Sequence, residues 1–384
     1  MSTAGAPSPP QPPDARHRDL VRTTPVDAWL RLPQPFLSRE AHAAGLSSTA
    51  IAGGVRRGEL VVLSRHLYAA RSCWSRLSAT EAHTALARAA QLSVAGSVVS
   101  HTSAALLHGL PRPWGPTGAV CLTARDSTRT AAHDDWRRVL DGALPGDHVT
   151  VVEGVPVTTV DRTVVDCLRT LRLRDGLAIA DAALGAGATV VRALERVRRQ
   201  QRGWPGVRTA DLGISLADGR RESWLESASV GTAVALGWPV PLSQVGIHRL
   251  DGAFVGRVDL LWADLGVVGE ADGRSKYLGQ FDEAWDAERA AALMVRERDR
   301  ERELESVGLA VARWGSSALR AGGGGLEVAL RAASHRARAD RVRCLWRDEA
   351  QGVLREWREL PPAPRIPRHL LPVNRHPGRQ RPVW

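Results

Sequence analysis

The stretch RVDLLWADLGVVGEADG, residues 257–273, decides how the C-terminal part of this 384-residue chain folds. It contains two short apolar runs, RVDLL (257–261) and GVVGEAD (266–272), separated by four residues, WADL. Two such runs joined by a short connection predict an antiparallel β-hairpin. We place its turn between Asp264 and Leu265.

Three carboxylates converge on one face of this hairpin. The register places Asp259 directly opposite Glu270, and the alternation of side chains along a strand puts Asp272 on the same face as Glu270. Like charges that face each other destabilise a sheet. A divalent cation such as Mg²⁺ would neutralise them, so the sequence predicts a metal site here.

The segments around the hairpin extend this pattern. A helix over RRESWLESASV precedes it and carries Glu222 and Glu226 one helical turn apart. The sequence leaves open which of these two glutamates faces the hairpin. A long helix from 282 to about 307 follows, and then GLAVARW predicts a further strand.

This order of elements resembles the PD-(D/E)XK nuclease core. Within that fold, the signature RVD…E.DG is similar to that of very-short-patch-repair-like endonuclease domains. The resemblance implies that Asp259 and Glu270 hold Mg²⁺ and that Glu226 supports the metal or its water. It implies an α/β core over residues 218–320.

The chain departs from that family in one place. The usual core has Glu-x-Lys, but position 272 is Asp, and Lys276, the only lysine of the chain, stands four residues further on. The resemblance implies that Lys276 and Asp272 are catalytic, with the lysine stabilising charge on the phosphate. The alternative is that Lys276 pairs with Asp272 or with Asp282.

The N-terminal stretch FLSREAHAAGLSSTAIAGGVRRGELVVLSRHLYAA, residues 36–70, predicts a helix–turn–helix. Ser38 caps a short helix, and Ser47 or Ser48 caps a second one, Thr49–Arg57. The runs ELVVL and HLYAA then predict a hairpin that would form a wing.

The motifs REAHAAGLS, RRGEL and HLYAA in this stretch resemble the N-terminal domain of AbiEi-type antitoxins. These are winged-helix repressors of type IV toxin–antitoxin operons, and the combination with a nuclease-like domain is familiar in actinobacterial proteins. The resemblance implies double-stranded DNA contacts by Thr49, Arg56, Arg57 and Arg65. Gly53 and Gly54 offer no side chain to a base edge. A winged helix used only for packing or protein contact is the alternative.

Three stretches of the middle region also resemble the AbiEi-like family: VVSHTSAALLHGLP, GVPVTTVDRTVVDCLR and GLAIADAALGAG. The spacing around His101 and His108 predicts that both are structural residues of a packed helix. We expect Asp161, Arg162 and Asp166 to form a capped, ion-paired helix start rather than an active centre.

The amino-acid composition limits which partners, cysteine-based sites and cellular locations we expect. The formal net charge of +11 favours a polyanionic partner such as DNA. Four widely spaced cysteines with no CxxC pair argue against a zinc site or a disulfide framework. No run is apolar enough for a membrane span, and we expect a cytoplasmic protein.

The expected fold class is an α+β multidomain protein. We divide the chain as follows: 1–25, a disordered Pro-rich leader; 26–71, a winged helix-turn-helix; 72–200, a mixed middle domain; 201–217, a connector; 218–320, the PD-(D/E)XK-like domain; 321–360, a glycine hinge and charged helix; 361–384, a disordered basic tail.

Two functions from different classes follow. The first is a DNA-binding transcriptional regulator of the AbiEi antitoxin type, with a cognate toxin or its operator as partner. The second is a Mg-dependent endodeoxyribonuclease that its winged helix delivers to DNA. A pure interaction protein is a third possibility, and the sequence leaves open whether the nuclease-like domain is an active enzyme.

Overall fold

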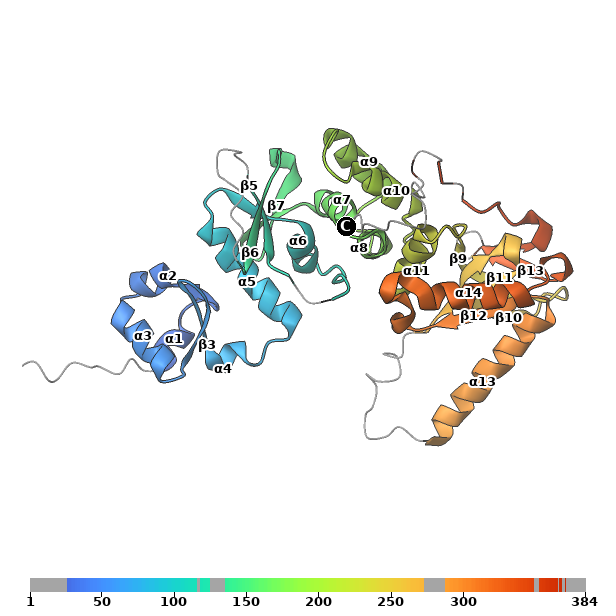
Figure 1. The fold of residues 1–384 in the computed structure, drawn as a ribbon, viewed down its shortest axis with the longest axis horizontal. Helices are drawn as coiled ribbons and strands as arrows, with labels where there is room; N and C mark the ends of the chain where they lie inside the picture. Colours follow the sequence, from blue (N-terminus) through green and yellow to red (C-terminus); the bar gives the residue numbers. More distant parts are fainter. Residues whose placement is uncertain are drawn as a thin grey trace, which may run out of the picture. The chain divides into compact units, whose positions relative to one another are not determined.

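The computed structural model describes residues 26–115, 118–124, 135–272, 287–348, 352–364, 366–367 and 370. Over these residues the fold is mixed α/β with three sheets. The chain divides into two compact units, Met1–Ser93 and Val94–Trp384 (Figure 1). Each unit is described by itself. No helix in the described ranges is both long enough and apolar enough to cross a membrane.

The first unit is built around a small antiparallel sheet of order β1-β3-β2. Its elements, in chain order, are α1 (Val26–Leu30), β1 (Phe36–Leu37), α2 (Ser38–Ala43), α3 (Ser48–Arg56), β2 (Leu60–Ser64), β3 (Leu67–Ala70), α4 (Arg71–Trp74) and α5 (Ala79–Ser93). The expected helix pair and hairpin are therefore present, and β2 and β3 pair from Leu60↔Ala70 to Ser64↔Leu67.

Local capping explains where α2 and α3 begin. Ser47 caps α3, and its Oγ accepts a hydrogen bond from the main-chain N–H of Ala50 at 3.1 Å. The expectation that Ser38 caps α2 is wrong, because Ser38 is the first helical residue. There, the Glu40 carboxylate accepts the N–H of Leu37 at 2.8 Å.

One glycine of α3 marks its buried face. A Cβ on Gly54 would lie 3.0 Å from the Trp29 ring and 3.1 Å from Leu60 Cδ1. Trp29 is fully buried, and its Nε1 donates to Glu59 at 3.0 Å. Gly54 therefore lets α3 approach the core of the unit closely, while the opposite face of the helix remains exposed.

Helix α5 belongs to this first unit, although we had assigned residues beyond 71 to the middle domain. Arg88 on α5 forms an ion pair with Glu40 at 2.5 Å, and Arg39 donates to the carbonyl of Leu92. Both contacts join α5 to α2.

The second unit begins with a five-stranded sheet of order β6-β5-β4-β8-β7. Its strands are β4 (Ser97–Val99), β5 (Val120–Ala124), β6 (Arg137–Asp141), β7 (Val149–Val152) and β8 (Val155–Thr158). The helices of this part are α6 (His101–Leu107), α7 (Val160–Thr170), α8 (Leu173–Gly185), α9 (Val191–Gln200) and α10 (Val207–Leu216). The stretch 201–217, which we expected to be a connector, contains α10. This helix buries Ala210 and Ile214 in the same core as α7.

The rest of the second unit is a six-stranded sheet of order β12-β11-β10-β9-β13-β14. Its elements are α11 (Trp224–Ala235), β9 (Leu242–His248), β10 (Phe254–Trp262), β11 (Val267–Ala271), α13 (Ala287–Ser306), β12 (Ala310–Trp314), α14 (Gly324–Arg336), β13 (Leu345–Asp348) and β14 (Leu354–Glu356). All neighbouring strands pair antiparallel except β11 and β12, which are parallel.

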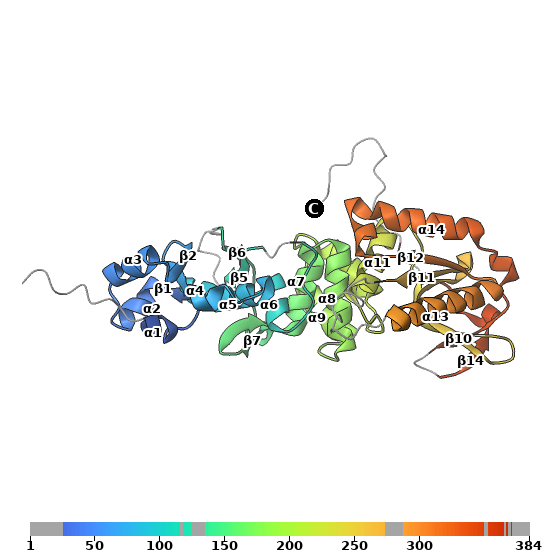
Figure 2. The ribbon, with the colours of Figure 1, turned by 90° about the horizontal axis from the view of Figure 1, so that it is seen from below.

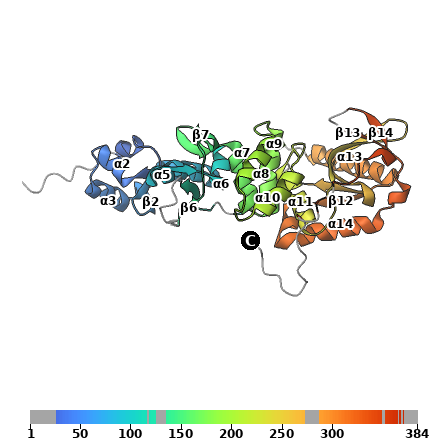
Figure 3. The same cartoon turned by 90° about the horizontal axis from the view of Figure 1, so that it is seen from above.

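Helices cover both faces of this sheet. Leu260 and Trp262 of β10 pack with residues of α11 and α14, whereas Leu261 and Val268 pack with Leu304 of α13. Figure 2 and Figure 3 show α14 and α13 on opposite sides of the sheet. The sheet is therefore buried between two helical layers, as expected for an α/β core.

Three sequence-based expectations for this region are wrong. Strand β9 was not predicted, and the region after Gly324 is not one charged helix, because β13 and β14 extend the sheet beyond β9. Glu222 does not share a helix with Glu226, because Ser223 is the N-cap and α11 starts at Trp224.

The middle helices pack directly on the C-terminal sheet domain. A Cβ on Gly231 of α11 would lie 2.7 Å from the Cα of Arg174 on α8. The guanidinium of Arg174 also donates to the carbonyl of Leu319 at 2.6 Å. These contacts explain why residues 94–384 form one compact unit.

Candidate functional site

The hairpin of β10 and β11 has the predicted register. Leu260 pairs with Gly269 and Trp262 with Val267, and a short 3₁₀ turn ending at Gly266 (φ 64°) joins the strands. Continued by one residue, this register places Asp259 opposite Glu270.

The carboxylates of Asp259 and Glu270 lie in different environments. Asp259 Oδ2 accepts the main-chain N–H of Ala271 at 2.9 Å, so this side chain closes the end of the ladder. Glu270 is only 8% exposed. Burial, together with a smaller effect of the negative charge of Asp259, raises the pKa of Glu270 to about 7 against the opposing effect of Arg300.

Arg300 of α13 is the counter-ion of Glu270. Its Nη2 lies 2.8 Å from Glu270 Oε2, and its Nη1 donates to the carbonyl of Arg257 at 3.1 Å. The other oxygen, Glu270 Oε1, is buried and accepts no hydrogen bond from any residue that the structure describes. One coordination position at Glu270 is therefore not used by the described residues.

The sequence left open whether Glu222 or Glu226 faces the hairpin, and Glu226 is the buried one of the two. Its Oε1 accepts the Ser223 hydroxyl at 2.7 Å, and its Oε2 accepts the N–H of Glu222 at 3.0 Å and the amide of Gln244 at 2.8 Å. Glu222 is instead partly exposed and pairs with Arg257 at 2.9 Å.

The three predicted metal ligands do not form one cluster. Among the described residues, no group of three or more His, Cys, Asp or Glu side chains could hold a metal ion. Asp259 and Glu270 are neighbours, whereas the carboxylate of Glu226 is engaged by Ser223 and Gln244.

The two predicted catalytic residues are only partly placed. Asp272 is exposed just after β11, and its main-chain N–H donates to the carbonyl of Trp314 at 2.9 Å. Lys276 lies outside the described residues, as does Asp282, which the sequence suggested as an alternative partner for this lysine.

Sequence reasoning missed Gln244, on the unpredicted strand β9. The pairs Ser243↔Leu260 and Val245↔Val258 place residue 244 opposite Asp259. Gln244 is 5% exposed and has a positive φ of 54° inside a strand. The alternation of Leu242, Val245 and Ile247 with polar residues in LSQVGIH was a weak signal for this strand.

These residues form one polar row across the sheet. The register aligns Gln244, Asp259 and Glu270 on β9, β10 and β11, and it pairs Glu270 with Arg313 on β12. We refer to Gln244, Asp259, Glu270 and Arg313 as the polar row. The carboxylate and amide oxygens of this row are of the type that Mg²⁺ prefers as ligands.

The predicted DNA-contacting residues lie on or near α3. Thr49 and Arg56 are exposed on the helix face away from Gly54, and Arg65 is exposed where the hairpin turns. Arg57 differs, because it pairs with Glu59 at 2.7 Å. The Glu59 carboxylate therefore already offsets the charge of Arg57.

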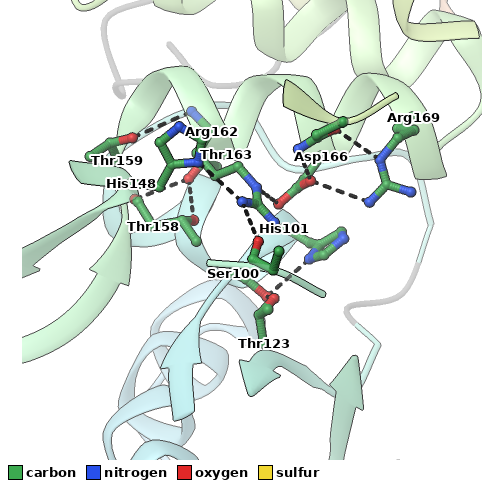
Figure 4. Close-up of polar contacts among 12 residues, drawn as sticks. Ser100, His101, Thr123, His148, Thr158, Thr159, Arg162, Thr163, Asp166 and Arg169 are labelled. Atoms are coloured by element: carbon green, nitrogen blue, oxygen red, sulfur yellow. Dashed lines mark hydrogen bonds and ion pairs between the residues drawn. The ribbon is translucent and has the colours of Figure 1, made fainter. Parts of the chain in front are cut away.

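The buried polar cluster in the middle region contains the capped, ion-paired helix start that the sequence predicted, although Asp161 accepts the Thr189 hydroxyl and is not part of the ion pair. Thr159 caps α7, and the Arg162 guanidinium donates to Asp166 at 2.7 Å and lies 3.1 Å from His148 Nδ1 (Figure 4). Burial would raise the pKa of Asp166, but neighbouring positive charges, including those of Arg162 and Arg169, lower it overall. Arg162 and Asp166 therefore form an ion pair that is buried inside the fold.

The two histidines of this region also have structural partners. His101 Nδ1 lies 2.9 Å from the Ser100 hydroxyl (Figure 4), and His108 Nε2 lies 2.7 Å from the carbonyl of Thr158. Burial lowers the pKa of His101 to about 4, so this histidine is neutral at pH 7.

No family model matches the chain. Two proteins of Mycobacterium tuberculosis, both named as uncharacterized, are 32% identical to it over 148 residues: MT2308 of strain CDC 1551 / Oshkosh and Rv2248 of strain ATCC 25618 / H37Rv. The match covers 38% of this chain and 54% of each relative, so the chain spans about half the length of these relatives.

Among solved structures, the chain is similar to the RV2827C protein from Mycobacterium tuberculosis. The sequence identity is 16% and the TM-score is 0.30, and the match covers 55% of this chain and 78% of the other. The names of these three proteins assign no activity.

Proposed function

We propose that this protein binds double-stranded DNA through its first unit, as a transcriptional regulator of the AbiEi antitoxin type. The exposed face of α3 carries the proposal, because Thr49 and Arg56 lie opposite the glycine that packs on the core. A capped helix pair followed by a hairpin is the order of a winged helix-turn-helix, which presents its second helix to the major groove.

The charges of the first unit support this proposal. Residues 26–93 contain eight arginines and four carboxylates. Two of the carboxylates, Glu40 and Glu59, are paired with Arg88 and Arg57. Arg56 and Arg65 are in no ion pair among the described residues, so they can contact phosphates.

A salt series on duplex DNA tests this proposal. We expect Arg56→Ala and Arg65→Ala each to weaken binding to all sequences and to lower the salt slope by about 1. Arg57→Ala is the matched control. We expect it to change the DNA affinity and the salt slope less, because Glu59 already offsets the charge of Arg57. If the affinity and slope of the Arg56→Ala/Arg65→Ala double variant equal those of the wild type, the DNA-binding surface lies elsewhere.

The second candidate function is a Mg-dependent endodeoxyribonuclease with a PD-(D/E)XK-like core. The observation that favours it is the adjacency of Asp259 and buried Glu270, with one Glu270 oxygen unused by the described residues. Mg²⁺ is usually held by one or two carboxylates together with substrate phosphates. When bound, it would neutralise the carboxylates and polarise a phosphate oxygen.

In this candidate function, Asp259 and Glu270 hold the cation. The resemblance implies that Lys276 and Asp272 are catalytic, and that Lys276 stabilises the charge that develops on the phosphate. A supercoiled plasmid tests the activity, and we expect nicking by the wild type with Mg²⁺ and none by Asp259→Asn. Metal binding without nicking would leave a nuclease-like domain that serves a DNA-binding regulator.

A further inference from the structure

Gln244 has an unusual backbone for a strand residue. Its φ of 54° lies in the left-handed region, which L-residues other than Gly, Asn and Asp seldom adopt. Such strained positions cost about 1–3 kcal/mol and cluster at functional sites. At Gln244 the strain falls on the residue opposite Asp259.

The orientation of the Gln244 amide follows from its partner. Both oxygens of Glu226 accept hydrogen bonds, from the Ser223 hydroxyl and from the N–H of Glu222. A carboxylate acceptor requires a donor, so the amide nitrogen of Gln244 faces Glu226 at 2.8 Å. The amide oxygen therefore points away from Glu226.

That oxygen has no protein partner in the described part of the chain. Gln244 Oε1 is buried and accepts no hydrogen bond there, which is also true of Glu270 Oε1. An unsatisfied buried acceptor costs about 1–3 kcal/mol. Two such oxygens therefore lie on one polar row, and no described residue donates a hydrogen bond to either of them.

We propose that Gln244 Oε1 is the third protein ligand of the divalent cation that Asp259 and Glu270 hold, and that Glu226 positions Gln244. This inference rests on the metal site of the proposed nuclease function. It explains why Glu226 is buried beside the site without joining a carboxylate cluster. A neutral amide oxygen also adds a hard ligand without adding a third negative charge.

Titration of the full-length protein with Mn²⁺ tests the role of Gln244 through metal affinity rather than activity. Gln244→Gly removes the ligand while tolerating the positive φ, and Gln244→Asn keeps an amide that is one methylene shorter. We expect both variants to lose about tenfold or more in Mn²⁺ affinity. Glu226→Gln keeps an acceptor for the Gln244 amide, and we expect a smaller loss.

Two further variants make the result interpretable. Ser243→Ala removes a neighbouring buried hydroxyl that bonds Arg221 at 3.1 Å, and we expect its Mn²⁺ affinity to equal that of the wild type. Asp259→Asn tests whether Mn²⁺ binds at the proposed metal site at all. Thermal unfolding without metal checks that each variant is folded.

The outcomes separate this inference from the proposed function. If Asp259→Asn abolishes Mn²⁺ binding but both Gln244 variants bind within twofold of the wild type, the metal site stands and the role of Gln244 is overturned. If Glu226→Gln loses more affinity than Gln244→Gly, Glu226 is the ligand and our assignment is wrong. A wild type that binds no Mn²⁺ overturns both.

Discussion

Asp259 lies opposite Glu270 on the neighbouring strand, and its carboxylate accepts the N–H of Ala271, the residue that follows Glu270, at 2.9 Å. The same side chain therefore extends the hairpin by one hydrogen bond and raises the pKa of Glu270 through its charge. The Asp259 carboxylate therefore stabilises the hairpin through its hydrogen bond and destabilises it through repulsion with Glu270. A substitution that keeps the hydrogen bond and removes the charge separates the two effects.

We expect Asp259→Asn to leave the metal-free protein as stable as the wild type or more stable. The amide oxygen still accepts the N–H of Ala271, while the repulsion with Glu270 disappears. In contrast, the wild type should gain about 2.7 kcal/mol at a Mg²⁺ concentration 100 times the Kd, and the variant should gain none. Urea unfolding with and without Mg²⁺ measures both effects, and an equal Mg²⁺ gain in both proteins would remove Asp259 from the site.

We expect Arg300→Met to lower the free energy of unfolding without metal by about 1–3 kcal/mol, because Glu270 loses its charged partner. The Mg²⁺ affinity should rise, since the guanidinium no longer competes for Glu270 Oε2. Arg302→Met is the control on the same helix, because its pair with Asp299 is exposed. A lower Mg²⁺ affinity in Arg300→Met would show that Arg300 supports the site instead.

We expect Gly54→Ala to destabilise the first unit by about 1–3 kcal/mol. Its Cβ would meet the Trp29 ring at 3.0 Å and Leu60 at 3.1 Å. Gly53→Ala is the matched comparison, because its Cβ would meet only the movable head of Arg57, at 2.9 Å, and the helix gains up to about 1 kcal/mol. Thermal unfolding should order the proteins as Gly53→Ala, wild type, Gly54→Ala, and the reverse order would contradict the packing of α3.

His101 should make the second unit less stable in acid. Its pKa is about 4 in the folded protein and about 6.5 when unfolded, so the unfolded chain binds more protons between these values. The stabilising contribution is complete above pH 6.5 and is lost as the pH falls towards 4, by at most about 1.4 kcal/mol per pH unit.

His101→Asn tests this contribution, because asparagine tolerates the positive φ of 53° at this position. The difference in unfolding free energy between wild type and variant should narrow as the pH falls from 6.5 to 4. Taking the difference removes the contributions of other titrating groups, including Glu270. A difference that stays constant with pH would mean that His101 does not change its protonation on unfolding.

The hairpin was predictable because its information is local. A four-residue connection and the alternation of two short runs fix which residue faces which, so the adjacency of Asp259 and Glu270 follows from the sequence alone. The capped helix pair of the first unit was predictable for the same reason, although Glu40 rather than Ser38 satisfies the start of α2.

The rest of the site depends on contacts between distant segments. Gln244 stands in a strand that we did not predict, and its importance appears only when α11 brings Glu226 within 2.8 Å. Arg300 is one of many arginines on a charged helix, and only the position of α13 selects it as the partner of Glu270. Strand β13 was missed because its pairing with β9 joins residues about a hundred positions apart.

The polar row also has a consequence for how the sheet folds. The strands that carry it are otherwise largely apolar, and such strands can pair in several alignments of similar energy. A slip of β10 by one residue would place Val258 or Leu260 opposite Glu270 and leave the buried carboxylate beside a hydrocarbon side chain. The row therefore penalises every misaligned sheet, and a protein in which it is replaced by apolar residues should fold into a mixture of strand alignments even if its hydrophobic core is larger.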